Sequence, residues 1–256
     1  MTALFRPMRP SRPATLVVAH RGHSAAAAEN SVAALEQAIA VGADIVECDV
    51  RIAGDGVLVA SHDADLKRLA GRAVVVADSP AAVLQAVARD AGAEVPPISD
   101  LMAAAWGRVP LMLDLKTGDP LVLRMIAETA LAARFRPEDL VLGLRSPSQV
   151  GVAQLLLPDA VRLALHGPGA PAAAFVELGV RLVRLWETAV SAASIRSAAE
   201  HGCRVWVTTG GPGTGRQVGD ADERALDALL RAGVSGLLVN DPGLGRRAVG
   251  RMAATA

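Results

Sequence analysis

Eight short apolar runs alternate along this chain with helical segments rich in Ala and Leu. Each run has the length of a strand covered on both faces, and such strands separated by helices are typical of parallel β-sheets. The runs occupy residues 15–20, 44–50, 111–116, 140–144, 161–166, 182–186, 204–208 and 236–240. Eight parallel strands favour an α/β fold closed into a (β/α)8 barrel with the helices outside, and a doubly wound open sheet is the alternative.

Helix boundaries are visible between several of these runs. Segment 31–41 places its apolar residues on one face and is followed by Gly42. Segment 224–231 likewise ends before a glycine, Gly233, a residue type that often terminates helices. The stretch 71–97 is the least regular part of the chain, and we expect a loop there that carries one short helix and forms a lip over the site.

Length and composition fit one large domain. The chain has 256 residues, of which 52% are hydrophobic and 20% are charged, and α/β barrels commonly reach this size as a single unit. We expect the barrel to occupy residues 15–256, preceded by an N-terminal extension at 1–14. The extension lacks the apolar segment of a secretory signal, and no later apolar run is long enough to cross a bilayer, so the sequence indicates a cytoplasmic protein.

Charge and cysteine content restrict the partners and the chemistry. The formal net charge is zero and the basic residues are scattered, which predicts a small-molecule substrate rather than nucleic acid or an anionic membrane. The two cysteines, Cys48 and Cys203, lie in strand-like runs without metal-ligand spacing. We expect them to be buried thiols without a functional role.

Two carboxylates project together from the second strand-like run. Because side chains alternate along a strand, Glu47 and Asp49 lie on one side and Cys48 on the other. Buried acids this close repel each other unless a cation or a shared proton offsets their charge, and hard oxygen ligands favour Mg²⁺, Ca²⁺ or Mn²⁺. The alternative is that both acids lie beyond the strand in solvent.

Further polar residues follow the neighbouring runs, where the active-site loops of an α/β barrel emerge. His20 and Arg21 come directly after the first run, and His62 follows a tight turn and a short apolar run. Asp114 and Lys116 end the third run on one side. A lone histidine is usually structural, and Lys116 could simply pair with Asp114.

Taken together, these residues predict a phosphoryl-transfer site. In such a site the cation neutralises phosphate charge, Arg21 and Lys116 donate to the phosphate oxygens, and the two imidazoles exchange protons with the attacking and leaving oxygens. The glycine-rich segment 210–215 lacks the spacing of a nucleotide-binding loop, and we interpret it as a connecting loop.

At these positions the sequence resembles the glycerophosphodiester phosphodiesterase family. The matching segments are AHRG at 19–22, ENS at 29–31, GAD at 42–44, ECDV at 47–50, DG at 55–56 and HD at 62–63, followed by Leu66, Arg68 and Gly71. Weaker echoes occur in LDLK at 113–116 and between residues 233 and 242, so the resemblance extends over nearly the whole chain.

The resemblance implies a TIM barrel that hydrolyses a small-molecule glycerophosphodiester to sn-glycerol 3-phosphate and an alcohol. It implies one divalent cation, Mg²⁺ or Ca²⁺, with Mn²⁺ as a further option. The implied roles are cation binding by Glu47, Asp49 and Asp114, acid/base catalysis by His20 and His62, phosphate binding by Arg21 and Lys116, and support of Arg21 by Glu29. Which histidine is the acid and which the base stays open.

Three positions depart from the pattern of that family. Asp114 stands where the family usually has Glu, Ser31 where it usually has Thr, and Trp206 is shifted relative to the usual W-T-V-N run. The shorter Asp114 side chain requires the cation to move or a water to bridge. The shifted tryptophan leaves the substrate choice open.

The later strand ends would carry the pocket for the alcohol. The main candidates for substrate binding are Trp186 and His166, with Arg145, Glu187, Thr208 and Asn240 nearby. Two alternative functions remain at this point: a related lipid-headgroup phosphodiesterase such as a lysophospholipase D, and a non-catalytic barrel that binds phosphodiesters without cutting them. Only Asp114 favours the second.

Overall fold

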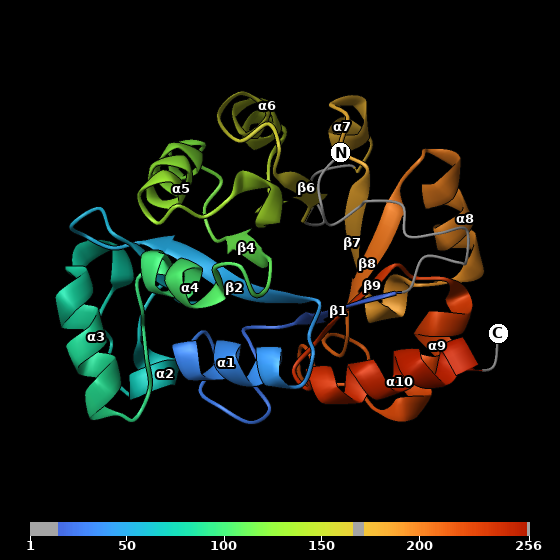
Figure 1. Ribbon diagram of the computed structural model, residues 1–256, viewed down its shortest axis with the longest axis horizontal. Helices are drawn as coiled ribbons and strands as arrows, with labels where there is room; N and C mark the ends of the chain where they lie inside the picture. The colour runs from blue at the N-terminus through green and yellow to red at the C-terminus, as the bar shows by residue number, and fades with distance from the viewer. Residues whose placement is uncertain (1–14, 166–171, 255–256) are drawn as a thin grey trace.

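The computed structural model describes residues 15–165 and 172–254 and shows a closed barrel (Figure 1). Its parallel strands are β1 (Leu16–Ala19), β2 (Ile45–Ile52), β4 (Leu111–Leu115), β5 (Leu140–Leu144), β6 (Val161–Ala164), β7 (Leu182–Trp186), β8 (Arg204–Thr208) and β9 (Gly236–Val239). Neighbouring strands pair in the order β1-β9-β8-β7-β6-β5-β4-β2, and β1 also pairs with β2. This last pairing closes the sheet, so the barrel is confirmed and the open doubly wound alternative is wrong.

Helices surround the barrel, as Figure 1 shows. They are α1 (Val32–Ala40), α2 (Lys67–Ala70), α3 (Ala81–Asp90), α4 (Ile98–Ala105), α5 (Leu121–Ala132), α6 (Pro147–Leu156), α7 (Ala172–Glu177), α8 (Ala192–Glu200), α9 (Glu223–Ala232) and α10 (Pro242–Ala254), with short 3-10 turns η2 (Val76–Asp78), η3 (Pro137–Asp139) and η4 (Glu187–Ala189). None of these helices is long and apolar enough to cross a membrane.

Capping residues explain where several helices begin and end. The Ser31 side chain accepts a hydrogen bond from the Ala34 N–H at the start of α1, and Asp222 caps α9 in the same way. Gly233 ends α9 in the left-handed conformation that glycine adopts without steric cost. The expected helices are therefore confirmed, with boundaries shifted by one residue.

The region between β2 and α4 is more regular than the sequence indicates. After a turn at Gly56, β3 (Leu58–Ala60) pairs antiparallel with β2. The following segment contains α2, η2 and α3, and these pack a small core of their own around Val59, Leu66 and Leu84. This unit lies beside the barrel near α1 and α4 (Figure 1). The expected lip is wrong, because no residue of 71–97 lines the cavity described below.

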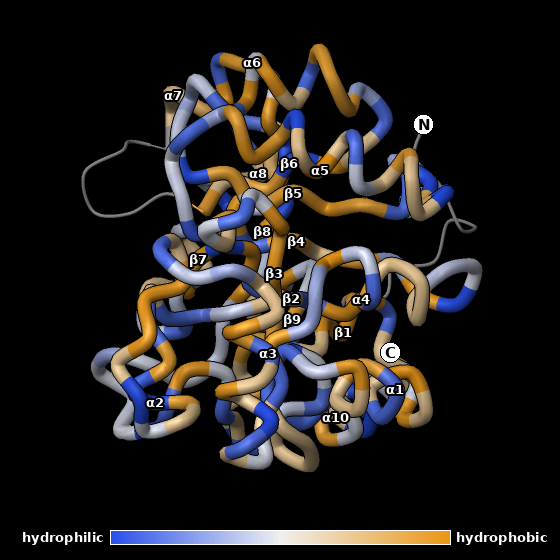
Figure 2. The backbone as a smooth tube through the Cα atoms, turned by 90° about the vertical axis from the view of Figure 1, so that its left-hand side faces the viewer, coloured by the Kyte–Doolittle hydropathy of each residue, from blue (hydrophilic) through white to orange (hydrophobic). Residues whose placement is uncertain are grey.

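Two further cores lie inside the barrel and between the barrel and its helices. Apolar side chains from alternate strand positions fill the interior, and the opposite faces of the same strands pack against the helices. Hydrophobic colour accordingly concentrates on the strands in the middle of the molecule (Figure 2). Trp206 is fully buried in the interior core. Gly236 must lack a side chain there, because a Cβ would lie 2.5 Å from the indole ring.

Two expectations concern residues that the structure does not describe, and a third concerns the cysteines. The N-terminal extension at 1–14 and the candidate His166 lie outside the described residues. Cys48 and Cys203 are buried free thiols, as expected.

Candidate active site

The candidate site lies at the C-terminal end of the barrel, on the inner faces of the strands. Along β2 the inward positions change from Ile45, which belongs to the interior core, to Glu47 and Asp49. Along β4 they change from Met112 to Asp114. A polar layer therefore rests on an apolar floor, and strand alternation alone positions its side chains.

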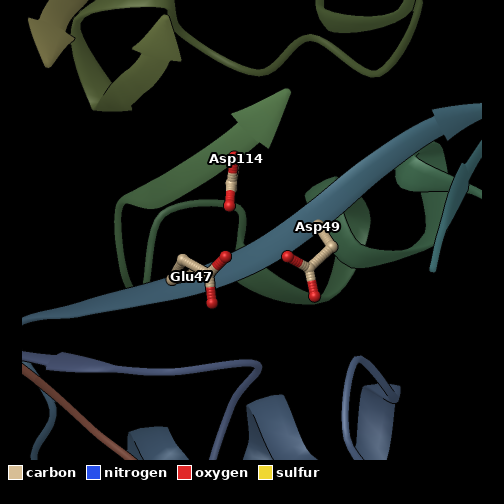
Figure 3. Close-up of side chains that lie close together, drawn as sticks. All are labelled: Glu47, Asp49 and Asp114. Atoms are coloured by element: carbon tan, nitrogen blue, oxygen red, sulfur yellow. The ribbon is translucent and has the colours of Figure 1, made fainter. Parts of the chain in front are cut away.

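Three carboxylates converge in this layer. Figure 3 shows Glu47 and Asp49 on β2 and Asp114 on the neighbouring strand β4. One oxygen from each carboxylate lies within 4.8 Å of the other two. Glu47 and Asp49 are buried, so the alternative that they project into solvent is wrong.

The charges of these acids are not equivalent. Burial, together with the carboxylates of Asp49 and Asp114, raises the pKa of Glu47 well above its usual value. Burial acts in the same direction on Asp49, but Lys116 and Arg21 outweigh it and the pKa of Asp49 falls below its usual value. A divalent cation would relieve the repulsion around Glu47, and three carboxylate oxygens are a donor set that suits Mg²⁺, Ca²⁺ or Mn²⁺.

Lys116 lies between two of the carboxylates. Its Nζ is 2.7 Å from Asp49 Oδ1 and 2.5 Å from Asp114 Oδ2. Burial lowers the pKa of Lys116, but these carboxylates raise it by a larger amount. The net pKa therefore lies above its usual value, and the ammonium stays charged. Pairing with Asp114 alone is thus an incomplete description of this lysine.

Arg21 is fixed by acids on three sides. Its backbone N–H donates to Glu47 Oε2 at 2.7 Å, its Nε lies 3.1 Å from Asp49 Oδ2, and its Nη1 lies 3.1 Å from Glu29. Glu29 therefore contacts Arg21, and it also pairs with Arg68 at 2.6 Å. Arg21 itself has a φ of 55°, in the left-handed region that few non-glycine residues adopt.

His20 is buried against the end of the last strand. Its Nδ1 lies 2.8 Å from Asn240 Oδ1. The Asn240 amide group donates to the Val218 carbonyl and to Asp220, so Oδ1 is the acceptor and the His20 proton resides on Nδ1, which leaves Nε2 as an acceptor. Burial, assisted by Arg21, lowers the pKa of His20 to about 4, and the imidazole is neutral at pH 7.

The loop after β8 closes against this hydrogen bond. Gly219 has a φ of +88°, and a Cβ there would lie 2.0 Å from Asn240 Oδ1 and 2.6 Å from His20 Nδ1. Its backbone N–H donates to the Thr209 carbonyl, and its carbonyl accepts from the Asn240 N–H. The glycine-rich segment 210–215 belongs to this same loop, which holds the His20 partner in place.

His62 has a different kind of partner. Its Nδ1 lies 2.7 Å from Asp63 Oδ1, and its side chain is 37% exposed. Burial raises the pKa of Asp63, but hydrogen bonds from His62 and Arg68 outweigh it and the pKa lies below its usual value. The partner of His62 is therefore an ionised carboxylate, whereas the partner of His20 is a neutral amide.

A cavity of about 290 Å³ opens above the carboxylates. Its polar lining residues are His20, Arg21, Glu47, His62, Asp114, Lys116, Arg145, Arg184 and Thr208, and Trp186 and Leu165 add apolar surface. Trp186 thus lines the cavity, as the sequence predicted for a substrate-binding residue. One cavity therefore brings together residues from strands on both sides of the barrel.

The other alcohol-side candidates have different outcomes. Arg145 lines the cavity and donates to Asp114 Oδ1 at 2.5 Å. Glu187 does not line it: its carboxylate accepts from the Gly210 N–H at 2.7 Å and pairs with Arg216. The expectation for Glu187 is therefore wrong, because the loop after β8 engages its carboxylate.

Two residues at the site were not identified from the sequence. Asn30 donates to Asp49 Oδ2 at 2.8 Å and accepts from the Asp49 N–H at 3.0 Å; the only sequence signal was its place in the ENS segment. Arg184 lines the cavity two residues before Trp186. The signal for Arg184 was a charged residue within an apolar strand, on the same face as the tryptophan.

The model of the glycerophosphoryl diester phosphodiesterase family matches residues 20–117. This segment of the chain is therefore similar to the family. Over 52 residues it is 58% identical to the probable glycerophosphodiester phosphodiesterase 1 of Mycobacterium tuberculosis, a stretch that covers 20% of this chain and 19% of that protein. Over 160 residues it is 26% identical to a lysophospholipase D of Rattus norvegicus, covering 58% of this chain and 50% of that protein. The matches thus span half or less of these relatives.

Solved structures of the family share the barrel. A putative glycerophosphoryl diester phosphodiesterase from Silicibacter pomeroyi aligns with a TM-score of 0.81 at 19% identity, covering 99% of each chain. A phosphodiesterase from Oleispira antarctica, in complex with the product sn-glycerol-3-phosphate, aligns with a TM-score of 0.75 at 21% identity, covering 92% of this chain and 96% of that one. At these identities the likeness confirms the fold alone.

The family match and the cavity overlap only in part. Both histidines, the three acids, Arg21, Glu29 and Lys116 fall within residues 20–117. Arg145, Arg184 and Trp186 line the same cavity but lie beyond that segment. The family's shared segment thus supplies one side of the cavity, and strands outside it supply the other.

Proposed function

We propose that this chain hydrolyses glycerophosphodiesters to sn-glycerol 3-phosphate and an alcohol with the aid of one divalent cation. The observation that carries the proposal is one cavity lined, within the matched segment, by two histidines, two basic side chains, Glu47 and Asp114, with the Asp49 carboxylate close to both of these acids. The Oleispira antarctica relative, whose structure contains sn-glycerol-3-phosphate as its product, supports this choice of product.

The cation would be held by Glu47, Asp49 and Asp114, and Mg²⁺, Ca²⁺ and Mn²⁺ are the candidates. When bound, it supplies positive charge to the phosphodiester oxygens. Although Asp114 is shorter than the family's usual Glu, its carboxylate reaches the other two. This reach argues against the non-catalytic alternative.

Arg21 and Lys116 would donate hydrogen bonds to the phosphate oxygens. Both side chains line the cavity and are already oriented by acids, so little conformational entropy is lost when substrate binds. Glu29 acts as a positioning residue for Arg21.

His20 is assigned the role of general base. Its Nδ1 proton is committed to Asn240, so Nε2 of the neutral imidazole can accept a proton from the attacking water or glycerol hydroxyl. The low pKa of about 4 keeps this nitrogen unprotonated at neutral pH.

His62 is assigned the role of general acid. Its Nδ1 donates to the Asp63 carboxylate, which orients the ring, and Nε2 is the nitrogen assigned to give a proton to the departing alkoxide. The two histidines thus have different partners, an amide for His20 and a carboxylate for His62, and the two roles are divided on this difference.

The test is hydrolysis of glycerophosphocholine and glycerophosphoethanolamine by the purified protein, first in EDTA and then with each metal. We expect release of glycerol 3-phosphate only after metal is restored, and at least a ~10²-fold loss in the Asp49→Asn variant. The matched control is Asp139→Asn. Asp139 pairs with Arg136 and directly precedes β5, so it lies at the end of that strand away from the site. No hydrolysis with any metal would contradict the proposal.

A lysophospholipase D activity is the second candidate function. It is favoured by the likeness to the Rattus norvegicus lysophospholipase D. Release of choline from lysophosphatidylcholine, compared with release from glycerophosphocholine, distinguishes the two. A higher kcat/KM for the acylated substrate would support the lysophospholipase D.

A further inference from the structure

Arg184 differs from the other basic residues that line the cavity. Arg21 pairs with Asp49, Lys116 pairs with Asp49 and Asp114, and Arg145 pairs with Asp114. Within residues 15–165 and 172–254, Arg184 has neither an ion pair nor a hydrogen-bond acceptor. Its side chain is nonetheless largely withdrawn from solvent, and the Asp114 carboxylate acts on it only from beyond ion-pair distance. Among the described residues, this cavity-lining cation therefore has no counter-charge in contact with it.

The position of this cation is well defined. Arg184 and Trp186 are two residues apart on β7 and point to the inside of the barrel, and the guanidinium carbon lies 4.2 Å from the centre of the indole ring. The guanidinium thus lies over one face of the tryptophan, where a cation is attracted to the aromatic ring. In the strand order, β7 lies opposite β2, so Arg184 and Glu47 line the cavity from opposite sides.

A guanidinium without a partner is unfavourable in such a place. Burial lowers the pKa of Arg184, but a guanidinium does not lose its proton under physiological conditions. A charged group withdrawn from water costs free energy unless an anion or acceptors offset the loss of hydration. The planar N–H donors of arginine match the two oxygens of a carboxylate or a phosphate.

Arg21 and Lys116, on the other side of the cavity, are the proposed hydrogen-bond donors to the scissile phosphate. A cationic headgroup would meet two guanidinium groups, those of Arg145 and Arg184, and would find one face of Trp186 occupied. A second anionic group on the substrate would give Arg184 a counter-charge and would be attracted, not repelled, by the two guanidinium groups.

We propose that Arg184, held in place by Trp186, binds a negatively charged group on the leaving alcohol, so that the preferred substrates are glycerophosphodiesters whose alcohol carries its own phosphate or carboxylate. This inference rests on the proposed function, since it names the substrate class for the same cavity. It concerns β7, a strand outside the segment that the family model matches.

The experiment compares a matched pair of substrates: glycerophosphoglycerol, and the same molecule with a phosphate on its second glycerol. For the wild type we expect kcat/KM to be at least about tenfold higher on the phosphorylated substrate, as for a hydrogen-bonded charge pair. In Arg184→Gln the ratio of the two kcat/KM values falls by at least about tenfold, and Arg184→Lys keeps part of the preference. The control is Arg162→Gln on β6, whose guanidinium binds the Pro158 and Ala160 carbonyls and does not line the cavity.

The outcomes separate this inference from the proposed function. Equal kcat/KM on both substrates, or an Arg184→Gln variant that slows both alike, overturns the inference while hydrolysis itself stands. If the wild type cuts no glycerophosphodiester, binding of the same two molecules is measured by calorimetry in EDTA. Tighter binding of the phosphorylated molecule that is lost in Arg184→Gln supports the inference. Equal binding of the two molecules overturns it. Circular dichroism verifies folding, and Arg184→Lys replaces the glutamine variant if that one unfolds.

Discussion

At the scale of single residues, the partners of a side chain determine its chemistry more than its type does. His20 and His62 line one cavity, yet one is bonded to the amide of Asn240 and the other to the carboxylate of Asp63. The division into base and acid proposed above follows from this difference.

Variants of the two histidines test that division. We expect His20→Ala and His62→Ala each to lower kcat on glycerophosphocholine by at least ~10²-fold, because each removes a proton transfer. On a glycerophosphodiester with p-nitrophenol as the leaving alcohol, His62→Ala should recover most of its rate, since p-nitrophenolate leaves without a proton. His20→Ala should not recover. Steady-state kinetics on both substrates provide the measurement, and the reverse pattern would exchange the two roles.

The buried His20 also links stability to pH. Its pKa is about 4 in the folded protein against 6.5 in an unfolded chain, so the unfolded state takes up the proton first as the pH falls. The stabilising contribution is complete above pH 6.5 and is lost toward pH 4, by about 3 kcal/mol. Urea unfolding in EDTA at pH 7 and pH 4 measures this loss. In His20→Asn the loss should be smaller by about that amount, and an unchanged loss would contradict the account.

Residue-level predictions from the sequence succeeded where local geometry determines the outcome. Strand alternation was sufficient to place Glu47 and Asp49 on the same side. It could not identify Asn240 as the hydrogen-bond partner of His20, because the two residues are 220 positions apart and meet only after the barrel closes. The Glu187 expectation failed for a related reason, since Arg216 comes from a distant loop.

At the scale of elements, the strands and the capped helices were predictable because their signals are local. Hydrophobic runs gave every barrel strand to within two residues, and Ser31 and Gly233 marked helix ends. The region between β2 and α4 was harder to predict. Its small core joins Val59 to Leu84 across an irregular segment, and no single window of sequence contains that contact pattern.

The loop between β8 and α9 allows a matched comparison of two glycines. Gly219 and Gly215 both have positive φ, so an alanine strains the backbone at either position. Only at Gly219 would the new Cβ meet Asn240 and His20; at Gly215 it meets nothing within 4 Å. We expect Gly219→Ala to lower kcat by at least about tenfold, by displacing the base, and Gly215→Ala to leave kcat near that of the wild type. Equal kcat values in the two variants, each verified as folded by circular dichroism, would contradict the role given to this loop.

At the scale of the whole molecule, the barrel divides labour between its sides. Strands β1, β2 and β4 and the residues directly after them supply the acids, Arg21, Lys116 and His20. Strand β7 carries Arg184 and Trp186, and Arg145 directly follows β5. The sequence predicted the first side well, because its motifs are dense and ordered. The second side depends on which strands face each other across the cavity, and that arrangement follows from closure rather than from any motif.

The pairing of the first strand with the last has a consequence for synthesis in the cell. Asn240 follows β9, so the ribosome must translate past residue 240 before His20 can find its partner. A nascent or prematurely terminated polypeptide that already contains every motif of the matched segment would still lack an oriented base. The proposed base therefore acquires the hydrogen bond that sets its tautomer only after the barrel seam between β1 and β9 has formed.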